Sequence, residues 1–499
     1  MKKFLKIFFV LVIILTVGYI GLNVFVSYRV KSLLNDQTEK GNLTYQRFSH
    51  NWINPSFRID SVVFRKGNNH ISVNQITVTG LKYTDYLFRN TLSVDEIIIS
   101  QPQLTLIKTK KDSVPPANND LEQSIRIGQI TIQKAGLTYQ TDSLQMIALK
   151  NYDINIQGIT VDTTSIKNQI PFNHTSLVVN GGKLSCSLSN IQTLELDSLI
   201  IDKNDINIHE LAVKPKYSRK DYVKFIPYEM DLMDVNFKRI TLSDYRIDSQ
   251  ERMFFSSKNM KIDSVNAEIY RNKVVRDDLS KKKMYSQMLR DLPFDLQIDT
   301  LQLSKVNLSY EEVQEKTGET GLVFFKNMEA TISDITNRNM NREDFPKTIA
   351  QIQTQFMGAS PLSVEWSFHI NNPDDTFRIT GESHHIPPEF INKFLQPAFN
   401  MQAEGTGIKD LYFNFSGNRY TANGNFKMVY DDLKIKVLKN DNEKSVNKLV
   451  TFVANLFVKS ENKARENDVE VEKVERDPTK SFWNYFWNCI MEGLKKTVI

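Results

Sequence analysis

The feature that most constrains this chain is the alternation of apolar and polar side chains that begins after Leu34 and continues over most of the sequence. Alternation with a period of two is typical of β-strands, because successive side chains of a strand point to opposite faces of a sheet. Helical periodicity is confined to a few short segments, of which residues 278–292 are one. The sequence therefore predicts a mainly β protein with few short helices.

A four-residue pattern, apolar–polar–polar–apolar, recurs within this alternation. Its eight copies are residues 59–62, 73–76, 94–97, 127–130, 196–199, 237–240, 262–265 and 298–301. Residues three apart lie on opposite faces of a regular strand, so both apolar residues share a face only if the strand bulges or bends at the polar pair. Strands that all bend in this way predict a long sheet curved into a trough. An ordinary β-sandwich also uses alternating strands and remains an alternative.

Residues 7–26 form an uncharged segment in which fifteen of the twenty residues are Leu, Ile, Phe or Val. As a helix this segment would be about 30 Å long, which matches the hydrocarbon core of a bilayer. The alternative is a cleaved signal peptide, but residues 23–28 offer no small-x-small cleavage site. We therefore expect an uncleaved single-pass anchor, with Lys2, Lys3 and Lys6 holding the N-terminus in the cytoplasm.

The charge distribution argues against nucleic acid as a partner. The whole chain has 63 Lys and Arg against 58 Asp and Glu. Residues 1–31 contain five of these basic residues and no acidic residue, so the remainder is balanced at 58 against 58. Proteins bind phosphate backbones with a clear excess of positive charge, and the chain after residue 31 has no such excess.

Motifs that carry chemistry are nearly missing from the sequence. Nucleophile-elbow, phosphate-loop and HExxH patterns are not found, and His384–His385 is the only histidine pair. Adjacent strand residues point to opposite faces, so this pair makes a poor metal site. Two cysteines, Cys186 and Cys489, exclude a disulfide framework and a multi-cysteine cluster. We expect no enzyme activity, no cofactor and no metal.

The C-terminal segment 477–499 predicts an amphipathic helix that starts at Asp477 and Pro478. Its apolar face is predicted to contain Phe482, Trp483, Phe486, Trp487, Ile490, Met491 and Leu494. The helix could pack on the sheet, lie in a membrane interface or bind a partner. Packing on the sheet is the preferred interpretation, because only Lys480, Lys495 and Lys496 offer positive charge to lipid headgroups.

We expect four regions along the chain. They are a cytoplasmic tip with the anchor (1–31), a repeat-like β region (32–290), a C-terminal β region (291–476) and the amphipathic helix (477–499).

The C-terminal third resembles a known family. The segments that carry the resemblance are LPFDLQID (292–299), GASPL (358–362), GTGIKDL (405–411), GNFKMVYDDLKI (424–435) and the tail RDPTKSFWNY (476–485). They are similar to the C-terminal domain of AsmA-like envelope proteins, and the tail is similar to the endings of members from bacteroidetes.

The resemblance implies a curved sheet with an apolar lining that is anchored in the inner membrane and projects into the periplasm. Members of this family are associated with phospholipid movement toward the outer membrane and with outer-membrane integrity, so phospholipids are the expected partners. A scaffold that assists outer-membrane protein assembly without binding lipid is the alternative. The candidate lining residues are Ile97, Ile99, Ile130, Ile132, Leu199, Ile201, Ile240, Leu242, Leu301 and Leu303.

Overall fold

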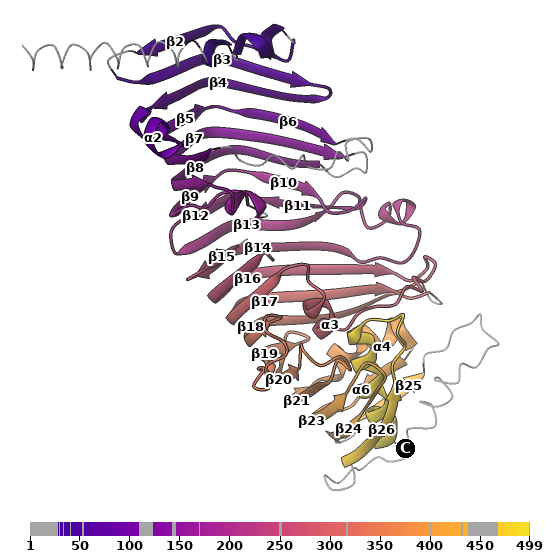
Figure 1. Ribbon diagram of the computed structural model, residues 1–499. Coiled ribbons are helices and arrows are strands. Elements are labelled where there is room, and N and C mark those ends of the chain that lie inside the picture. The colour runs from indigo at the N-terminus through magenta and orange to yellow at the C-terminus, as the bar shows by residue number, and fades with distance from the viewer. Residues whose placement is uncertain are drawn as a thin grey trace, which may run out of the picture. The chain divides into compact units, whose positions relative to one another are not determined.

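The computed structural model describes residues 28–498 apart from 29, 33, 40, 52–53, 109–122, 142–145, 169, 249–251, 316–317, 400, 431–432 and 438–467. The chain is mainly β, as predicted, and most of its strands belong to one large mixed sheet (Figure 1). The predicted anchor, residues 7–26, lies outside the described residues. Within the described part of the chain, no helix combines the length and the apolar composition needed to cross a bilayer.

The chain divides into two compact units. The first comprises Met1–Leu188, Leu194–Ile208 and Ser249–Arg252, and the second comprises Ser189–Thr193, His209–Asp248 and Met253–Ile499. The boundary predicted between residues 290 and 291 lies inside the second unit. Strands β11 (Gln192–Leu196) and β13 (Asp205–Pro215) have residues in both units.

The first unit is built from long strands with short connections. Residues 28, 30–32 and 34–39 are helical and precede the first strand. The elements that follow are β1 (Leu43–Thr44), β2 (Arg47–Asn51), β3 (Ser56–Lys66), β4 (Asn69–Thr79), α2 (Tyr83–Arg89), β5 (Thr91–Ser100), β6 (Gln103–Lys108), β7 (Ser124–Thr141), β8 (Met146–Val161), η1 (Ser165–Lys167), β9 (Ser176–Gly181), β10 (Leu184–Ser187) and β12 (Ser198–Ile201). Most neighbouring strands are antiparallel, but β7 pairs in parallel with both β5 and β6.

The second unit combines strands with several helices. Its elements are η2 (Tyr222–Phe225), β14 (Leu232–Ser243), β15 (Arg246–Asp248), β16 (Phe254–Asn272), α3 (Tyr285–Arg290), β17 (Asp295–Val313), β18 (Thr320–Thr336), β19 (Thr348–Phe356), β20 (Ser360–Phe368), β21 (Phe377–Ile386), α4 (Pro388–Phe399), β22 (Met401–Glu404), β23 (Ile408–Gly417), β24 (Thr421–Tyr430), β25 (Lys434–Val437), β26 (Asp468–Glu475) and α6 (Phe482–Val498). Strands β16 and β17 are parallel, so the connection that contains α3 crosses from one end of the pair to the other.

The strands change direction at left-handed residues in the four-residue pattern. Ser61 and Ser264 are the second polar residues of copies 59–62 and 262–265, and their φ angles are 54° and 58°. Such angles are uncommon for residues other than glycine and mark a local bend. Ile262 and Val265 are both buried, which is consistent with both lying on the same face of the sheet.

Other copies have the left-handed residue on the partner strand. Gly158 (φ 64°) lies between Gln157 and Ile159, which pair with residues 129 and 127 of the copy at 127–130. Asp334 (φ 59°) lies between residues that pair with Thr300 and Ile298 in the same way. The bend therefore belongs to a pair of strands, and only one strand of the pair has to adopt the unfavourable conformation.

The helix expected at 278–292 is shorter in the structure. Only α3, Tyr285–Arg290, is helical, and residues 278–284 form an irregular connection. The carboxylate of Asp278 accepts a hydrogen bond from the Ser280 backbone N–H, which competes with a helical turn at this point. Of the predicted apolar face, Met284 is buried, whereas Leu279 and Met288 are exposed.

Candidate functional site

The predicted lining residues of β5 and β7 lie side by side. Ile97 pairs with Ile130 and Ile99 pairs with Ile132 in the parallel register of these strands. Residues directly opposite one another in a ladder share a face of the sheet. The four isoleucines therefore form two adjacent rows on one face.

These rows continue through the neighbouring strands in both directions. In each pair of neighbouring strands a large apolar residue lies opposite another large apolar residue, except where Leu199 pairs with Gly181. We define the apolar face of the first unit by the thirteen residues Ile59, Ile76, Val78, Ile97, Ile99, Ile130, Ile132, Ile154, Ile156, Leu177, Val179, Leu199 and Ile201. Six of them were predicted, and the other seven belong to strands with the same alternation.

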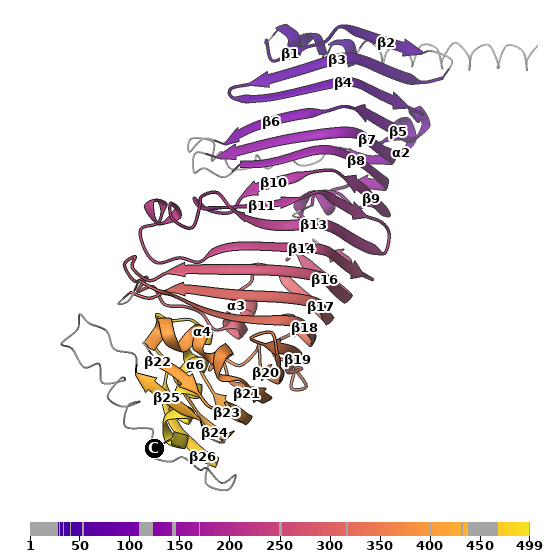
Figure 2. The ribbon, with the colours of Figure 1, turned by 180° about the vertical axis from the view of Figure 1, so that it is seen from behind.

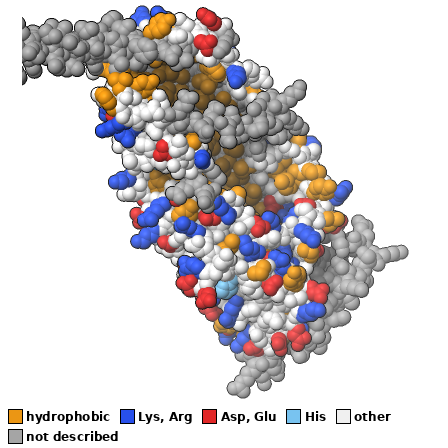
Figure 3. All heavy atoms as spheres, viewed as in Figure 1, with side chains coloured by type: hydrophobic (Ala, Val, Ile, Leu, Met, Phe, Trp, Pro, Cys, Tyr) orange, Lys and Arg blue, Asp and Glu red, His pale blue; other side chains and the backbone are white. Residues whose placement is uncertain are grey.

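The apolar face is only partly buried. Val179 is the one member with an exposed fraction below a tenth, at 7%, and the other twelve are half-buried. Figure 3 shows hydrophobic side chains gathered over the strands of the first unit.

The opposite face of the same strands is polar. Thr131, Gln133, Asn155 and Asn180 line a shallow hollow of about 660 Å³, to which Ile132, Ile154 and Val178 also contribute. The hydroxyl oxygen of Thr131 accepts hydrogen bonds from the side-chain amides of Gln129 and Asn155, at 3.0 and 3.3 Å. The first unit is therefore an amphipathic sheet whose two faces differ sharply in polarity.

The four candidates of the second unit also share one face. Ile240 and Leu242 pair with Ile262 and Met260 in β16, and these two residues pair with Leu303 and Leu301 in β17. Ile240 and Leu242 are 5% and 8% exposed, so a ligand could reach them only by displacing their neighbours. Leu301 and Leu303 are half-buried.

The C-terminal helix packs on the apolar side of the last strands. Phe482 stacks on Trp366 of β20 with ring centroids 5.0 Å apart, and Phe486 meets Phe413 of β23 edge to face at 5.3 Å. Gly493 allows the closest approach, because a Cβ atom there would lie 2.4 Å from the Phe426 side chain. Figure 1 shows α6 lying across the strands of this region. The helix and these strands form the main hydrophobic core of the second unit.

The buried side of α6 differs from the predicted one by a rotation about the helix axis. Phe482 is buried, and Phe486, Ile490 and Leu494 pack against the core, as the predicted face requires. Tyr485 and Cys489 are each 1% exposed and were not predicted. Their spacing from Phe482, three and seven residues, is the signal that could have identified them.

Trp483 and Trp487 lie at the edge of this contact and not at its centre. They are 48% and 36% exposed, and Met491 is half-buried. The indole N–H of Trp483 donates to the Tyr285 hydroxyl at 2.8 Å, and the Trp487 ring packs against Phe394 at 5.2 Å. Both tryptophans are therefore held by other helices while part of each ring remains accessible.

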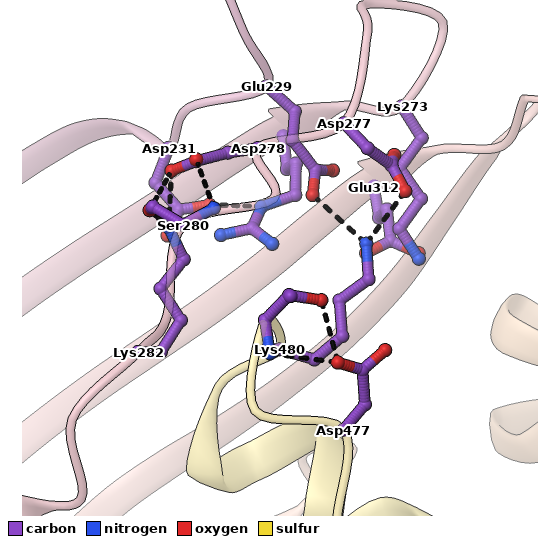
Figure 4. A network of polar contacts seen from close by, with 12 residues as sticks. Glu229, Asp231, Lys273, Asp277, Asp278, Ser280, Lys282, Glu312, Asp477 and Lys480 are labelled. Atoms are coloured by element: carbon purple, nitrogen blue, oxygen red, sulfur yellow. Dashed lines mark hydrogen bonds and ion pairs between the residues drawn. The ribbon is translucent and has the colours of Figure 1, made fainter.

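A polar network holds the start of α6. Lys480 donates to carboxylates of Glu229 and Asp277, at 3.4 and 3.0 Å (Figure 4). Burial by itself would lower the pKa of Lys480, but the hydrogen bond to Asp277 and the charge of Glu229 raise it overall. The helix begins at Phe482 and not at the predicted Asp477, whose carboxylate instead accepts a hydrogen bond from the Thr479 backbone in a preceding turn.

A second charged cluster fastens α3 beside the same core. The side chain of Asp375 is fully buried and accepts hydrogen bonds from Arg290 at 2.8 Å, Arg419 at 3.1 Å and the Ser286 hydroxyl at 2.9 Å. A buried carboxylate needs such partners, because an unpaired charge in the interior is strongly unfavourable.

Several titratable side chains of the described residues form hydrogen-bonded pairs. No group of three or more His, Cys, Asp or Glu residues there could hold a metal ion. Asp60 of the repeated pattern receives hydrogen bonds from Arg58 and Gln75, which lower its pKa. His384 contacts Asp410 at 2.8 Å, and both cysteines are free thiols.

Comparison with known proteins does not place the chain in a group: no family model matches it, and no curated protein matches it in a sequence search.

Proposed function

We propose that this chain is a membrane-anchored protein that binds phospholipid acyl chains along the apolar face of the first unit. The observation that carries the proposal is the register of large apolar residues from β3 to β12, which is interrupted only where Leu199 pairs with Gly181 and in which every residue except Val179 is half-buried. Patches of this kind mark sites that bind lipid, protein or an apolar ligand.

An acyl chain is the occupant that fits the chemistry of this face. The thirteen residues carry no charge and no hydrogen-bonding side chain, so they have nothing with which to orient a polar ligand. Transfer of an acyl chain into water costs about 0.8 kcal/mol per methylene, or about 13 kcal/mol for sixteen carbons. A continuous apolar strip removes that cost along its length and selects weakly among lipids.

The resemblance to AsmA-like proteins supplies the setting. In this proposal residues 7–26 span the inner membrane once, the N-terminus is cytoplasmic and both units lie in the periplasm. The bends at the four-residue pattern favour a trough-like curvature that would shield the acyl chains from water. The cellular role is to support phospholipid supply to the outer membrane and thereby its integrity.

Site-specific photocrosslinking tests the proposal. A benzophenone side chain introduced at Ile130 or Ile132 would sit on the apolar face, whereas the same group at Thr131 or Gln133 would sit on the polar face of the same strand. We expect phospholipid adducts at residues 130 and 132 and none at residues 131 and 133. No adduct at any position, or equal adducts on both faces, would contradict acyl-chain binding, and the first outcome is what a scaffold without lipid would give.

A charge-substitution pair provides an independent readout. Ile130→Asp combined with Ile132→Asp should abolish co-purification of lipid with the full chain, because two carboxylates would then lie on the lipid path. Thr131→Asp combined with Gln133→Asp places the same charges on the polar face and should leave lipid binding unchanged. Circular dichroism checks that both variants retain the sheet.

A further inference from the structure

The segment α2 exposes three consecutive large apolar residues. Tyr86, Leu87 and Phe88 are 45%, 57% and 84% exposed, and Phe88 is more exposed than any other large apolar residue in the described part of the chain. A single exposed apolar side chain needs no explanation, but three in sequence at a protruding connection indicate a surface that meets another apolar phase.

The fold holds α2 firmly while it presents these side chains. Tyr83 is buried at the start of the helix, and the Lys82 backbone N–H donates to the Ser93 carbonyl at 2.9 Å. Lys82 also forms an ion pair with Asp95 at 2.6 Å. The exposure of residues 86–88 is therefore a property of an anchored element.

Apolar side chains continue from α2 into the start of β5. Leu92 follows three residues after the helix, is 42% exposed and pairs with Ile125 at the start of β7. Figures 1 and 2 both show α2 at the ends of β5 and β7. An acyl chain that reached α2 would thus meet Leu92 at the start of β5, and the polar pair Asp95 and Glu96 separates this residue from Ile97 and Ile99 of the apolar face.

The sequence indicates which apolar phase lies nearby. The uncharged segment 7–26 ends sixteen residues before β1 starts at Leu43, so the first unit is tethered within at most about 60 Å of any bilayer that this segment spans. Tyr28, 71% exposed, and the basic side chains of Lys82 and Arg89 are of the kinds found at the level of lipid headgroups.

We propose that α2 docks in the outer surface of the bilayer that holds the anchor, with Tyr86, Leu87 and Phe88 among the upper acyl-chain carbons. This inference deepens the proposed function and rests on it, because it makes α2 the place where a lipid passes from the leaflet onto the apolar face of the first unit. Lys82 and Arg89 then lie at the level of the phosphate groups.

Fluorescence quenching in vesicles tests the docking. The full chain, with Cys186 and Cys489 replaced by alanine, is reconstituted in phosphatidylethanolamine and phosphatidylglycerol vesicles that contain spin-labelled lipid. A polarity-sensitive label is attached at Phe88→Cys or, as matched control, at Met146→Cys. Met146 is 47% exposed, apolar and at the other end of the strands, where β8 pairs with the end of β7.

We expect the label at residue 88 to shift to shorter wavelength and to be quenched by the spin-labelled lipid, and the label at residue 146 to do neither. No quenching at residue 88 overturns the docking, and so does equal quenching at both positions, which would indicate non-specific adsorption. Energy transfer between labels at residue 88 of two copies, without quenching, would assign α2 to a contact between copies and would also overturn it.

A double substitution separates this inference from the proposed function. Leu87→Asp with Phe88→Asp should reduce the lipid adduct at residue 132 about fivefold or more while leaving the sheet intact. Quenching at residue 88 without any adduct at residue 132 would contradict acyl-chain binding on the apolar face. An adduct at residue 132 without quenching at residue 88 would contradict only the docking of α2.

Discussion

The apolar face of the first unit and the apolar face beneath α6 are built in the same way but differ in what covers them. Both consist of rows of large apolar residues in register across neighbouring strands. Phe415 and Phe426 beneath α6 are fully buried, whereas Ile130 and Ile132 are only half-buried. The difference lies in one added layer, in which a helix of 17 residues contributes Phe482, Tyr485 and Cys489.

Strand alternation specifies that a sheet has an apolar face, but it does not specify whether another element covers that face. A covered face contributes to stability through burial, at roughly 25 cal/mol per Å². A face of the same composition that stays accessible contributes less to stability and is available for a ligand. Substitutions on the two faces should therefore differ in their effect on stability.

The largest expected effect follows removal of a side chain at the centre of the covered face. Phe482→Ala should lower the free energy of unfolding of the second unit by about 3–5 kcal/mol, because it leaves a cavity between Trp366 and Phe377. Ile132→Ala in the first unit is the matched change, and it should cost less than about 1.5 kcal/mol, because that side chain is only half-buried. Denaturant unfolding of the full chain measures both, and equal costs would remove the distinction between the two faces.

The charged cluster beside the covered face should give the next largest effect. Asp375→Asn keeps the size of the side chain and tolerates the left-handed backbone there, φ 56°, but leaves Arg290 and Arg419 without their carboxylate. We expect a loss of about 3 kcal/mol. Asp344→Asn removes an exposed carboxylate from its pair with Arg342 and should cost less than about 1 kcal/mol. A small effect of Asp375→Asn would show that the layer covering this face does not depend on the charged cluster around Asp375.

The pH dependence of stability should report the network near the start of α6. Burial by itself would raise the pKa of Glu312, but hydrogen bonds from Lys273 and Tyr310 lower it overall. A lowered folded-state pKa contributes stability that is present above the unfolded value near 4.5 and is lost as pH falls through the folded value. Between about pH 5 and pH 3 the wild-type chain should therefore lose more stability than Glu312→Gln. Parallel curves would mean that this carboxylate does not contribute.

The alkylation rates of the two cysteines compare the two units without any substitution, and we expect this comparison to give the smallest effect. Burial on the inner side of α6 raises the pKa of Cys489 to about 12, whereas Cys186 on β10 of the first unit is half-buried. Because the thiolate is the reactive form, we expect iodoacetamide at pH 8 to alkylate Cys186 at least about tenfold faster. Peptide mapping by mass spectrometry measures both sites, and denaturant should abolish the difference. Equal rates in the native chain would show that α6 detaches readily.

Local patterns in the sequence were informative where the physical cause is local. Left-handed residues, Ser61 and Ser264, stand at two of the polar pairs where three-residue spacing of apolar side chains predicted a departure from a regular strand. The left-handed residues at Gly158 and Asp334 were not foreseen. Their positions follow from cross-strand register, which one strand alone does not reveal.

The C-terminal helix is a second case in which one segment of the sequence does not reveal its contacts with distant segments. Its apolar character is evident from residues 482–494, but its start at Phe482 depends on the contacts of Lys480 with Glu229 and Asp277, which are distant in sequence. Which side of the helix is buried depends on the aromatic residues of β20 and β23 that receive it.

By itself, the sequence determined that the chain is mainly β, that its strands are apolar on one side and that the strands depart from regular geometry at Ser61 and Ser264. Period-two alternation and three-residue spacing act within a single strand, so they can be deduced from neighbouring residues. Only the tertiary structure decided that Ile130 and Ile132 remain accessible while Phe415 and Phe426 are fully buried. Burial depends on which other element packs on a face, and that element, α6, lies far away in the sequence from the strands it covers.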